Sequence, residues 1–561
     1  MAWFDAEMLW PALPPAWLLA EHGDWLALDK PTDVACPPGM ERLDHAQHPR
    51  RNDVFSRLRR AEPEAPASLP LCALFDPLDG DLAQKPNSGS AVSGVCILSR
   101  RPETSETFTQ HEAQGRVRLT AVVGVHGWPG DKHADRERRD VLARRFAELA
   151  LTLRQERVQG PRALLTLQYA SGRCFDLVRE LARLGLTVAG PRDDPLLPRA
   201  PRLFLHRSEV AMPLGTLQAP VPPSFSRWLA DAEPEPFEER LDAALRRRYT
   251  LGLTQETTAF RLLDSVSDDL TIDRYGPDVV LSSLVDLNEK AGTAAVQAEL
   301  GAGVAMARRI GERLGARSVY LKLRPRQTNT LVDAVAAGLA PQAPVYGLQV
   351  GDAVEILENG LKFGARLGGG LGTGIYLDQR DNRRWVRDHC AGLRVLNTFA
   401  YTCAFSVAAA AGGALRTVSI DAAASALADG RANFERNGFE DAERHDLIRG
   451  DVFHWLPRLA RRGDRFDFII LDPPSYSRVK TRRFSASSDY ADLVATALGL
   501  LAPGGSLLAC SNSLGIDRKR LHQMVMDGAH LAGRNLCAVQ HRPPSLDHPG
   551  GRMKALVARF D

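Results

Sequence analysis

The chain has 561 residues, too many for a single hydrophobic core, and its length indicates three or four domains. Its 71 basic and 68 acidic residues nearly balance and 44% of its residues are hydrophobic, which excludes a charged tail and a largely disordered chain. The eight cysteines form no CxxC or Cys/His cluster, so we expect reduced thiols, a cytoplasmic location and no bound metal.

Two segments need to be distinguished from targeting or membrane signals. The first seven residues, MAWFDAE, place acids before any apolar run, so we expect no signal peptide. Residues 395–415 carry no charge over about the length of a membrane span, but polar residues and a glycine pair interrupt them. We therefore expect a buried strand, turn and helix there, and no membrane partner.

Proline-rich segments divide the chain. Residues 191–202 and 219–237 predict loops or linkers, and residues 339–347 form a weaker boundary. We therefore predict three parts, which are 1–232, 238–345 and 346–561.

Short motifs in the first part resemble the RluA-type pseudouridine synthases, which implies an α+β fold. The resemblance is carried by residues 25–31 (WLALDKP), 76–79 (DPLD), 93–98 (SGVCIL), 171–173 (SGR) and 201–206 (PRLFLH). Polar residues that the synthases use are replaced here by Pro77, Leu119, Phe175 and Val178, so that only Asp79 remains. We therefore predict an RNA-binding domain that has lost synthase chemistry.

The last part alternates strand-like and helical patterns. Apolar runs at 393–399, 416–421, 445–451, 466–472 and 505–511 are separated by helical segments such as 422–437 and 489–501, and a final strand is expected at 554–560. This alternation predicts an α/β domain with a mostly parallel sheet covered by helices on both faces.

Polar residues follow four of these predicted strands, at the edge where open parallel sheets bind ligands. Asn397 to Thr402 follow the first strand, Asp421 the second, Asp451 the third and Asp472 the fourth. An acid in the second position can accept both hydroxyls of a ribose, and an acid with an apolar neighbour can hold an adenine. Each acid alone could instead be a helix N-cap, but together they predict a nucleoside site.

This pattern resembles the class I methyltransferases, and the cofactor that the resemblance implies is S-adenosylmethionine. Residues 358–363 (ENGLKF) and 373–383 (TGIYLDQRDNR) sharpen the likeness to large-subunit ribosomal RNA methyltransferases of the cytosine-C5 and guanine-N7 types. The likeness extends back through 261–263, 272–276 and 320–324, and implies a small central α/β domain that serves as an RNA platform. Residues 378–384 carry part of this resemblance, and the alternative interpretation is that they form a charged helix exposed to solvent.

The resemblance assigns a role to each candidate site residue. It implies cofactor binding by Gln379, Arg380, Asn397, Phe399, Tyr401, Thr402, Asp421, Asp451, Val452 and Asp472. It implies that the target base is lined by Asp472, Pro473, Pro474 and Asn512.

The segment 508–513 (LACSNS) bears on which atom is methylated. Cytosine-C5 enzymes need a nucleophilic thiolate, and the similar cytosine enzymes carry it in a Ser-Cys-Ser context. Here Asn512 stands at that position, and Cys510 lies one pleat back, where we expect a buried core cysteine. The Ser-Asn pair resembles the guanine-N7 branch instead.

We therefore predict a methyltransferase that acts on a purine nitrogen of RNA, with guanine N7 favoured and 23S ribosomal RNA or a large-subunit precursor as the partner. Four alternatives stay open. They are an exocyclic amine as the target, a cytosine-C5 enzyme that uses Cys510, a bifunctional pseudouridine synthase and methyltransferase that uses Asp79, and a non-catalytic RNA-binding assembly factor.

Overall fold

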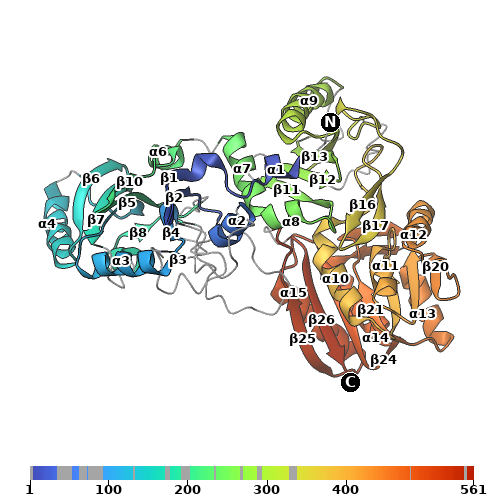
Figure 1. Cartoon of the computed structure of the whole chain (residues 1–561). Helices are drawn as coiled ribbons and strands as arrows, with labels where there is room; N and C mark the ends of the chain where they lie inside the picture. Colours follow the sequence, from blue (N-terminus) through green and yellow to red (C-terminus); the bar gives the residue numbers. More distant parts are fainter. Residues whose placement is uncertain are drawn as a thin grey trace. The chain divides into compact units, whose positions relative to one another are not determined.

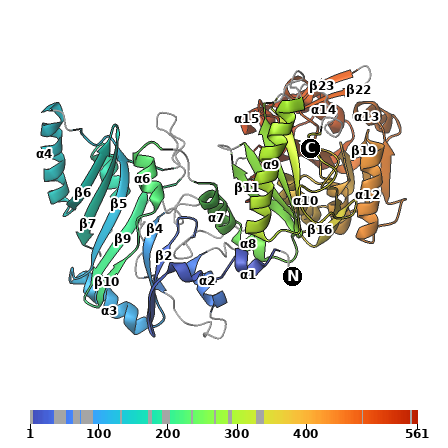
Figure 2. The same ribbon diagram turned by 90° about the horizontal axis from the view of Figure 1, so that it is seen from above.

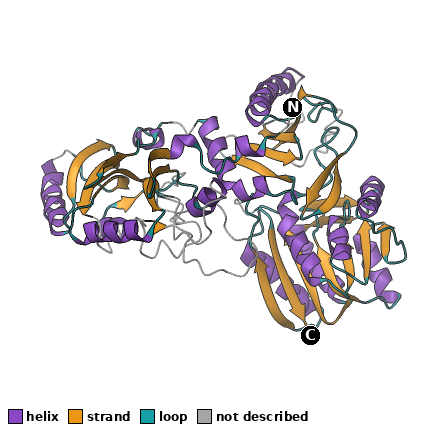
Figure 3. Cartoon of the chain, viewed as in Figure 1, coloured by secondary structure: helices purple, strands orange, loops and turns teal. Residues whose placement is uncertain are grey.

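The computed structural model describes residues 4–34, 53–61, 72–73, 92–130, 133–170, 177–190, 202–232, 236–265, 269–286, 293–326, 338–479, 482–548 and 552–561. It divides the chain into two compact units, one of Ala6–Leu253 and one of Thr254–Asp561 together with Met1–Asp5 (Figure 1). Both units combine helices and strands (Figure 2, Figure 3). None of the helices in these residues has the length and apolar character needed to cross a membrane.

The N-terminal unit is built on a mixed sheet. Within the described ranges its strands run in the order β1-β2-β4-β9-β5-β7-β6, with β3, β8 and β10 paired to β4, β5 and β9. The strands are β1 (Leu18–His22), β2 (Trp25–Lys30), β3 (Cys72–Ala73), β4 (Ser93–Ser99), β5 (Arg118–His126), β6 (Thr152–Gln159), β7 (Arg162–Ala170), β8 (Thr187–Val188), β9 (Leu205–Met212) and β10 (Gly215–Gln218). The helices are α1 (Ala6–Leu9), η1 (Pro15–Trp17), α2 (Val54–Ala61), α3 (Pro102–Ala113), α4 (His133–Glu148), α5 (Leu177–Arg183), α6 (Pro223–Leu229), α7 (Phe237–Arg247) and α8 (Tyr249–Leu253).

Two of the positions at which the sequence departs from the synthase motifs lie in the core of this unit. Leu119 on β5 packs in one apolar cluster and Val178 on α5 in another, and both side chains are buried. Pro77, Asp79 and Phe175 lie outside the described residues.

The prediction of a loop or linker over 219–237 is wrong for part of that segment. Helix α6 lies within it and begins at Pro223, a position where the fixed backbone angle of proline favours a helix start. Its Phe225 is fully buried and contacts Phe204 edge to face, with ring centroids 5.1 Å apart. The proline content therefore reflects a helix that starts at a proline and packs on the sheet.

The C-terminal unit begins with a sheet ordered β11-β12-β13-β14-β15 in the described residues. Its elements are β11 (Ala259–Ser265), β12 (Leu270–Tyr275), β13 (Asp278–Val285), α9 (Thr293–Leu314), β14 (Ser318–Pro325) and β15 (Tyr346–Gly347). β13 and β14 are parallel and joined through α9, and a hairpin of β16 (Val354–Glu358) and β17 (Leu361–Ala365) follows.

The rest of this unit is a sheet ordered β20-β19-β18-β21-β24-β26-β25. Its strands are β18 (Arg394–Thr398), β19 (Arg416–Asp421), β20 (His445–Arg449), β21 (Phe466–Leu471), β24 (Leu501–Ser511), β25 (Leu536–Arg542) and β26 (Lys554–Phe560), and a separate hairpin is formed by β22 (Tyr476–Val479) and β23 (Arg482–Ser485). Its helices are η2 (Leu377–Gln379), α10 (Arg380–His389), α11 (Ala404–Ala411), α12 (Ala424–Arg436), α13 (Val452–Arg461), α14 (Ala486–Leu498) and α15 (Arg518–Leu531). β18 to β21 and β24 are parallel, and β26 is antiparallel to both of its neighbours.

The predicted mostly parallel sheet is thus confirmed, and its two faces explain the apolar runs. Successive strand residues point to opposite faces. On β21, Ile469 and Leu471 pack in the cluster that includes α14 and α15, whereas Phe468 and Ile470 pack in the cluster that includes α10 and α11. The uncharged stretch over 395–415 forms β18 and α11, as predicted for a buried strand, turn and helix.

Candidate cofactor and target site

The sheet order brings the predicted site residues to one edge. β18 lies between β19 and β21, β20 pairs with β19, and β24 pairs with β21. Because these strands are parallel, their carboxyl ends share an edge. The segment after β18, Asp421 after β19, Asp451 after β20, Asp472 after β21 and Asn512 after β24 therefore lie along it.

The loop after β18 has an unusual backbone. Phe399, Tyr401 and Cys403 adopt left-handed conformations, with φ of 53°, 50° and 60°. Such angles are uncommon for residues other than glycine and cluster at functional sites. Asp421 holds the loop in place, since one carboxylate oxygen accepts from the Tyr401 amide (2.8 Å) and the other from the Ala423 amide (2.8 Å). The Asp421 side chain stays partly exposed, so it keeps lone pairs for ribose hydroxyls.

Two of the predicted cofactor ligands lie beneath this loop. Asn397 is buried and donates to the Ser406 hydroxyl (2.9 Å), which in turn contacts the Ser419 hydroxyl (2.8 Å). Thr402 is also buried, and its hydroxyl donates to the carbonyl of Gly374. These contacts hold the loop after β18 in place.

Asp451 forms the N-cap of α13, where its carboxylate accepts from the Phe453 amide (3.1 Å). Helix capping, the alternative role considered for each acid, therefore accounts for one hydrogen bond of Asp451. Its neighbour Val452 is buried in the core. The apolar side chains beside Asp451 are half-buried rings, since Phe453 contacts Phe399 with ring centroids 5.9 Å apart. Phe453 also contacts the buried ring of Phe484 (5.1 Å).

The segment 377–389 forms a buried, ion-paired structure and not the solvated charged helix that was the alternative. Arg383 donates twice to Glu358, with both N···O distances 2.6 Å. Arg380 donates to both carboxylate oxygens of Asp547, at 2.7 and 3.0 Å, and both side chains are buried. The pairing with Arg380 holds the pKa of Asp547 well below its usual range, despite burial.

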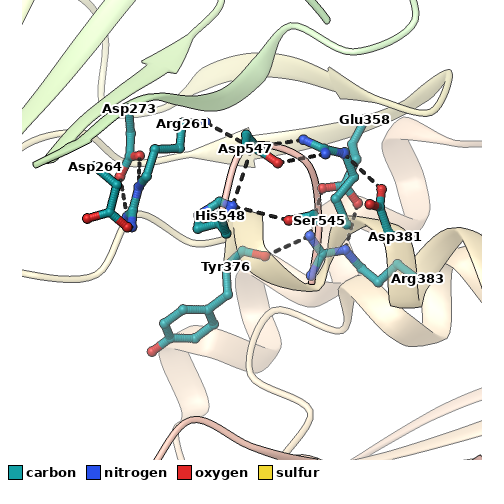
Figure 4. Close-up of polar contacts among 11 residues, drawn as sticks. Arg261, Asp264, Asp273, Glu358, Tyr376, Asp381, Arg383, Ser545, Asp547 and His548 are labelled. Atoms are coloured by element: carbon teal, nitrogen blue, oxygen red, sulfur yellow. Dashed lines mark hydrogen bonds and ion pairs between the residues drawn. The ribbon is translucent and has the colours of Figure 1, made fainter. Parts of the chain in front are cut away.

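Figure 4 shows these contacts, which involve β11, β12, β16, the segment 376–383 and the loop that contains Asp547. Asp547 also accepts from the backbone amide of Arg261 on β11 (3.0 Å), and the Arg261 guanidinium is bound by Asp273 (2.7 Å). The Arg380 donors thus fix the start of α10 to the loop that contains Asp547, which in turn is bonded to β11.

Gln379 reaches the site in a way that the sequence prediction did not specify. Its side-chain nitrogen donates to Asp472 (2.8 Å), and its oxygen accepts from Asn382 (2.6 Å), which sets the orientation of the amide. Burial of the carboxyl, together with the negative charge of Asp378, raises the pKa of Asp472 to about 7. Asp472 is thus an acid whose charge changes near neutral pH.

The segment after β21 meets the end of β24. Pro473 is buried and Pro474 is exposed. The Ser475 hydroxyl donates to the side-chain oxygen of Asn512 (2.9 Å), and both residues are exposed. Next to them Tyr476 exposes 56% of its surface, which leaves an aromatic ring available for stacking.

Cys510 is fully buried in the core, as the sequence predicted. Its thiol lies 3.9 Å from the side-chain oxygen of Gln379, and its carbonyl accepts from the Tyr490 hydroxyl (2.8 Å). Burial and the nearby charge of Asp472 raise the pKa of the Cys510 thiol well above its usual range. A thiol in this environment is protonated at neutral pH, so it is a poor nucleophile.

A glycine-rich segment, 368–374, connects the β11–β15 sheet to the loop after β18, and sequence reasoning missed this. Lys322 on β14 donates to the carbonyls of Gly370 (2.6 Å) and Gly372 (3.1 Å). On the other side, the Tyr401 hydroxyl accepts from the amide of Gly374 (3.1 Å). At Gly368 a β-carbon would lie 2.1 Å from a backbone oxygen, so only glycine fits there. The run of glycines was the available signal, but its partners are distant in sequence.

The comparisons with known proteins agree with this geometry. The family of S-adenosylmethionine-dependent methyltransferases matches residues 346–556. The ribosomal RNA large subunit methyltransferase of Deinococcus radiodurans is 36% identical over 315 residues, which cover 54% of this chain and 73% of that protein. The ribosomal RNA large subunit methyltransferase I of Aeromonas salmonicida is 35% identical over 334 residues, which cover 58% and 80%. A solved structure of a protein assigned as a methyltransferase, in complex with S-adenosylhomocysteine, is 27% identical and covers 68% of this chain and 97% of that one, with a TM-score of 0.49.

The sheet and the residues at its carboxyl edge thus define a Rossmann-like, S-adenosylmethionine-dependent methyltransferase in the C-terminal half of the chain. The chain belongs to the family of ribosomal RNA large subunit methyltransferases.

Proposed function

We propose that the chain methylates 23S ribosomal RNA, or a precursor of the large subunit, at a purine nitrogen, with guanine N7 favoured. The observation that carries this proposal is Asn512, which is exposed after β24 and bonded to Ser475. An amide side chain can hold the edge of a base but cannot attack it. The names of the relatives support the substrate class.

Direct transfer suits these residues. S-adenosylmethionine supplies an electrophilic methyl group when bound, and guanine N7 carries a free lone pair. The reaction therefore needs neither a general base nor a covalent intermediate, and orientation of the base can supply about 7 kcal/mol or more. In this proposal Asn512, Pro473 and Pro474 hold the base, and Tyr476 stacks on it.

The cofactor residues divide into ligands and supports. We assign the ribose to Asp421, the adenine edge to Asp451 and the methionine part to the loop with Phe399 and Tyr401. Gln379 orients Asp472 at the reacting end. Supporting roles fall to the residues held from beneath, which are Asn397, Thr402, Val452 and Arg380.

An exocyclic amine of guanine or adenine is the second candidate, because a carboxylate such as Asp472 can accept a hydrogen from an amino group. Cytosine C5 is disfavoured by the burial of Cys510. For the remaining parts we propose that residues 1–232 bind RNA without synthase chemistry, that residues 238–345 serve as an RNA platform and that residues 346–561 catalyse the transfer.

The test is methylation of large-subunit ribosomal RNA by the purified chain, with mass spectrometry of the nucleosides. 7-Methylguanosine supports the proposal, an N2- or N6-methylated purine supports the second candidate, and 5-methylcytidine refutes both. New pseudouridine would favour the bifunctional alternative, and no modification at all would favour an assembly factor.

Cofactor binding is tested separately by calorimetry. Asp421→Ala should weaken binding of S-adenosylmethionine more than tenfold, because charge-assisted hydrogen bonds are worth about 1.5–3 kcal/mol. Asp446→Ala is the matched control, since this acid lies at the amino end of β20, away from the site, and forms an ion pair with Arg416 at 3.8 Å. Equal binding by both variants would contradict the assignment of Asp421.

A further inference from the structure

Basic side chains from two elements gather at the carboxyl edge of the methyltransferase sheet, and we call this surface the basic edge: Arg518, Lys519, Arg520, His522 and His541. Its positive charge comes from Arg518, Lys519 and Arg520 at the start of α15. β24 ends at Ser511 at that edge, so α15 begins there. β25 and β24 are both antiparallel to β26, so β25 also ends there. Figure 1 shows α15 beside β25 and β26, and the His522 and His541 rings contact each other, with a nitrogen–nitrogen distance of 3.2 Å.

The charges on α15 are contrary to what helix stability favours. Arg518, Lys519 and Arg520 occupy its first turn, which contains no acid. The positive end of a helix dipole favours acids at this place and disfavours cations. Asp517 caps the helix by accepting from the backbone amide of Arg520 (2.7 Å), and none of the three cationic side chains pairs with an acid among the described residues.

Several arginines at the opposite, amino edge of the same sheet are paired with acids. Arg416 contacts Asp446, Arg462 contacts Asp464 and Arg534 contacts Asp561. At the basic edge, by contrast, three consecutive cations have no acidic partner among the described residues. Partial burial and the charges of His522 and Arg518 also lower the pKa of His541, as expected where cations are crowded.

The basic edge begins beside the proposed target position. Asn512 lies six residues before Arg518 in the chain. The turn between them is anchored at Ser513, whose carbonyl accepts from Lys554 (2.6 Å), and it presents Leu514 with 86% of its surface exposed. A polyanion that passes over these cations would therefore also reach Asn512.

We propose that the basic edge binds the phosphodiester backbone of the RNA next to the target nucleotide. This inference rests on the proposed function, and it names the surface by which the substrate is held. Unpaired arginines and lysines are the groups that neutralise phosphates, and each neutralised phosphate makes binding more dependent on salt.

The test removes two charges of the basic edge by combining Arg518→Gln and Arg520→Gln in the full chain. The matched control is Arg461→Gln with Arg465→Gln, two exposed arginines at the amino edge. The measurements are affinity for large-subunit ribosomal RNA transcribed in vitro over a salt series, affinity for S-adenosylmethionine, and the unfolding temperature. We expect RNA affinity to fall at least tenfold at about 0.1 M salt and the slope of log K against log salt to decrease by about 1.5. The control should stay within twofold of the wild type, and cofactor affinity should not change.

Three outcomes would overturn this inference. The first is wild-type RNA affinity and salt slope in the Arg518/Arg520 variant. The second is an equal loss in the control. The third is a lower unfolding temperature in the variant, which would show that the two arginines stabilise the fold. If the wild-type chain neither binds nor methylates the RNA, the proposed function fails as well, whereas methylation by the wild type with unchanged binding by the variant refutes only the basic edge.

Discussion

Asp547→Asn should destabilise the C-terminal unit by about 3–5 kcal/mol, because it leaves a buried arginine without its counter-charge. Asp547 is fully buried and accepts from Arg380 twice, at 2.7 and 3.0 Å (Figure 4). The asparagine keeps an oxygen for the Arg261 amide, so the loss comes mainly from the ion pair. The measurement is urea unfolding of the full chain followed by circular dichroism at neutral pH.

The control uses a second acid on the same guanidinium. Asp381 contacts the Nε of Arg380 at 3.3 Å, but 31% of its side chain is exposed. Exposed pairs contribute little, so Asp381→Asn should cost less than about 1 kcal/mol. Asp547→Leu with Arg380→Met removes both charges and should recover much of the loss, since apolar replacements of buried pairs are often tolerated. Equal costs for Asp547→Asn and Asp381→Asn would refute the reasoning.

The pH dependence gives an independent check. The folded-state pKa of Asp547 lies well below its ordinary value, because Arg380 stabilises the carboxylate. A lowered pKa gives a stabilisation that is complete above the unfolded pKa, about 4, and is lost as the pH falls through the folded value. The difference between the wild type and Asp547→Asn should therefore be constant from pH 5 to 7, and it should shrink only under strongly acidic conditions.

Three further changes test the site. Lys322→Met removes both donors to the glycine-rich segment and should weaken S-adenosylmethionine binding several-fold by calorimetry, whereas the exposed Lys362→Met should leave it unchanged. Cys510→Ala should retain methylation within a few-fold, and RNA with 5-fluorocytosine should give no denaturant-stable adduct; an adduct that this variant abolishes would make Cys510 the nucleophile. Because the pKa of Asp472 is about 7, affinity for the cationic S-adenosylmethionine should rise as the pH rises through 7 and the carboxylate forms. S-adenosylhomocysteine, which lacks the sulfonium charge, should show a smaller rise, and a pH dependence that persists in Asp472→Asn would contradict this.

The strands of the methyltransferase sheet could be predicted because parallel strands are buried on both faces and give continuous apolar runs. β25 could not, since it lies at the edge of the sheet and its sequence, LCAVQHR, alternates weakly and is mostly exposed or half-buried. Helix α6 was missed for a different reason. The prolines at its start are equally typical of a linker.

Residues at strand ends could be predicted for the same physical reason, since an acid at the end of a strand, such as Asp421, or just after one, such as Asp451, lies at the ligand edge. The sequence could not predict which polar side chains form their hydrogen bonds within the protein and are therefore not available to a ligand. Arg380 pairs with Asp547, 167 positions away, and Lys322 bonds to carbonyls 48 and 50 positions away. A short sequence motif does not indicate partners that are distant in the chain. Residues that contact a ligand and residues that hold the site in place therefore could not be distinguished from the motif.

The loop after β18 shows why a support can matter as much as a ligand. Left-handed residues cost about 1–3 kcal/mol each, and this loop has three of them within five positions. The bonds from the Tyr401 amide to Asp421 and from the Gly374 amide to the Tyr401 hydroxyl hold that geometry from two sides. The strain is therefore offset by folding contacts before any ligand arrives, so the binding energy of the cofactor need not be used to shape the loop. Under the proposed function, such a loop accepts S-adenosylmethionine and its demethylated product in one geometry, and the position of the methyl group is then set by the protein and not by induced movement of the loop.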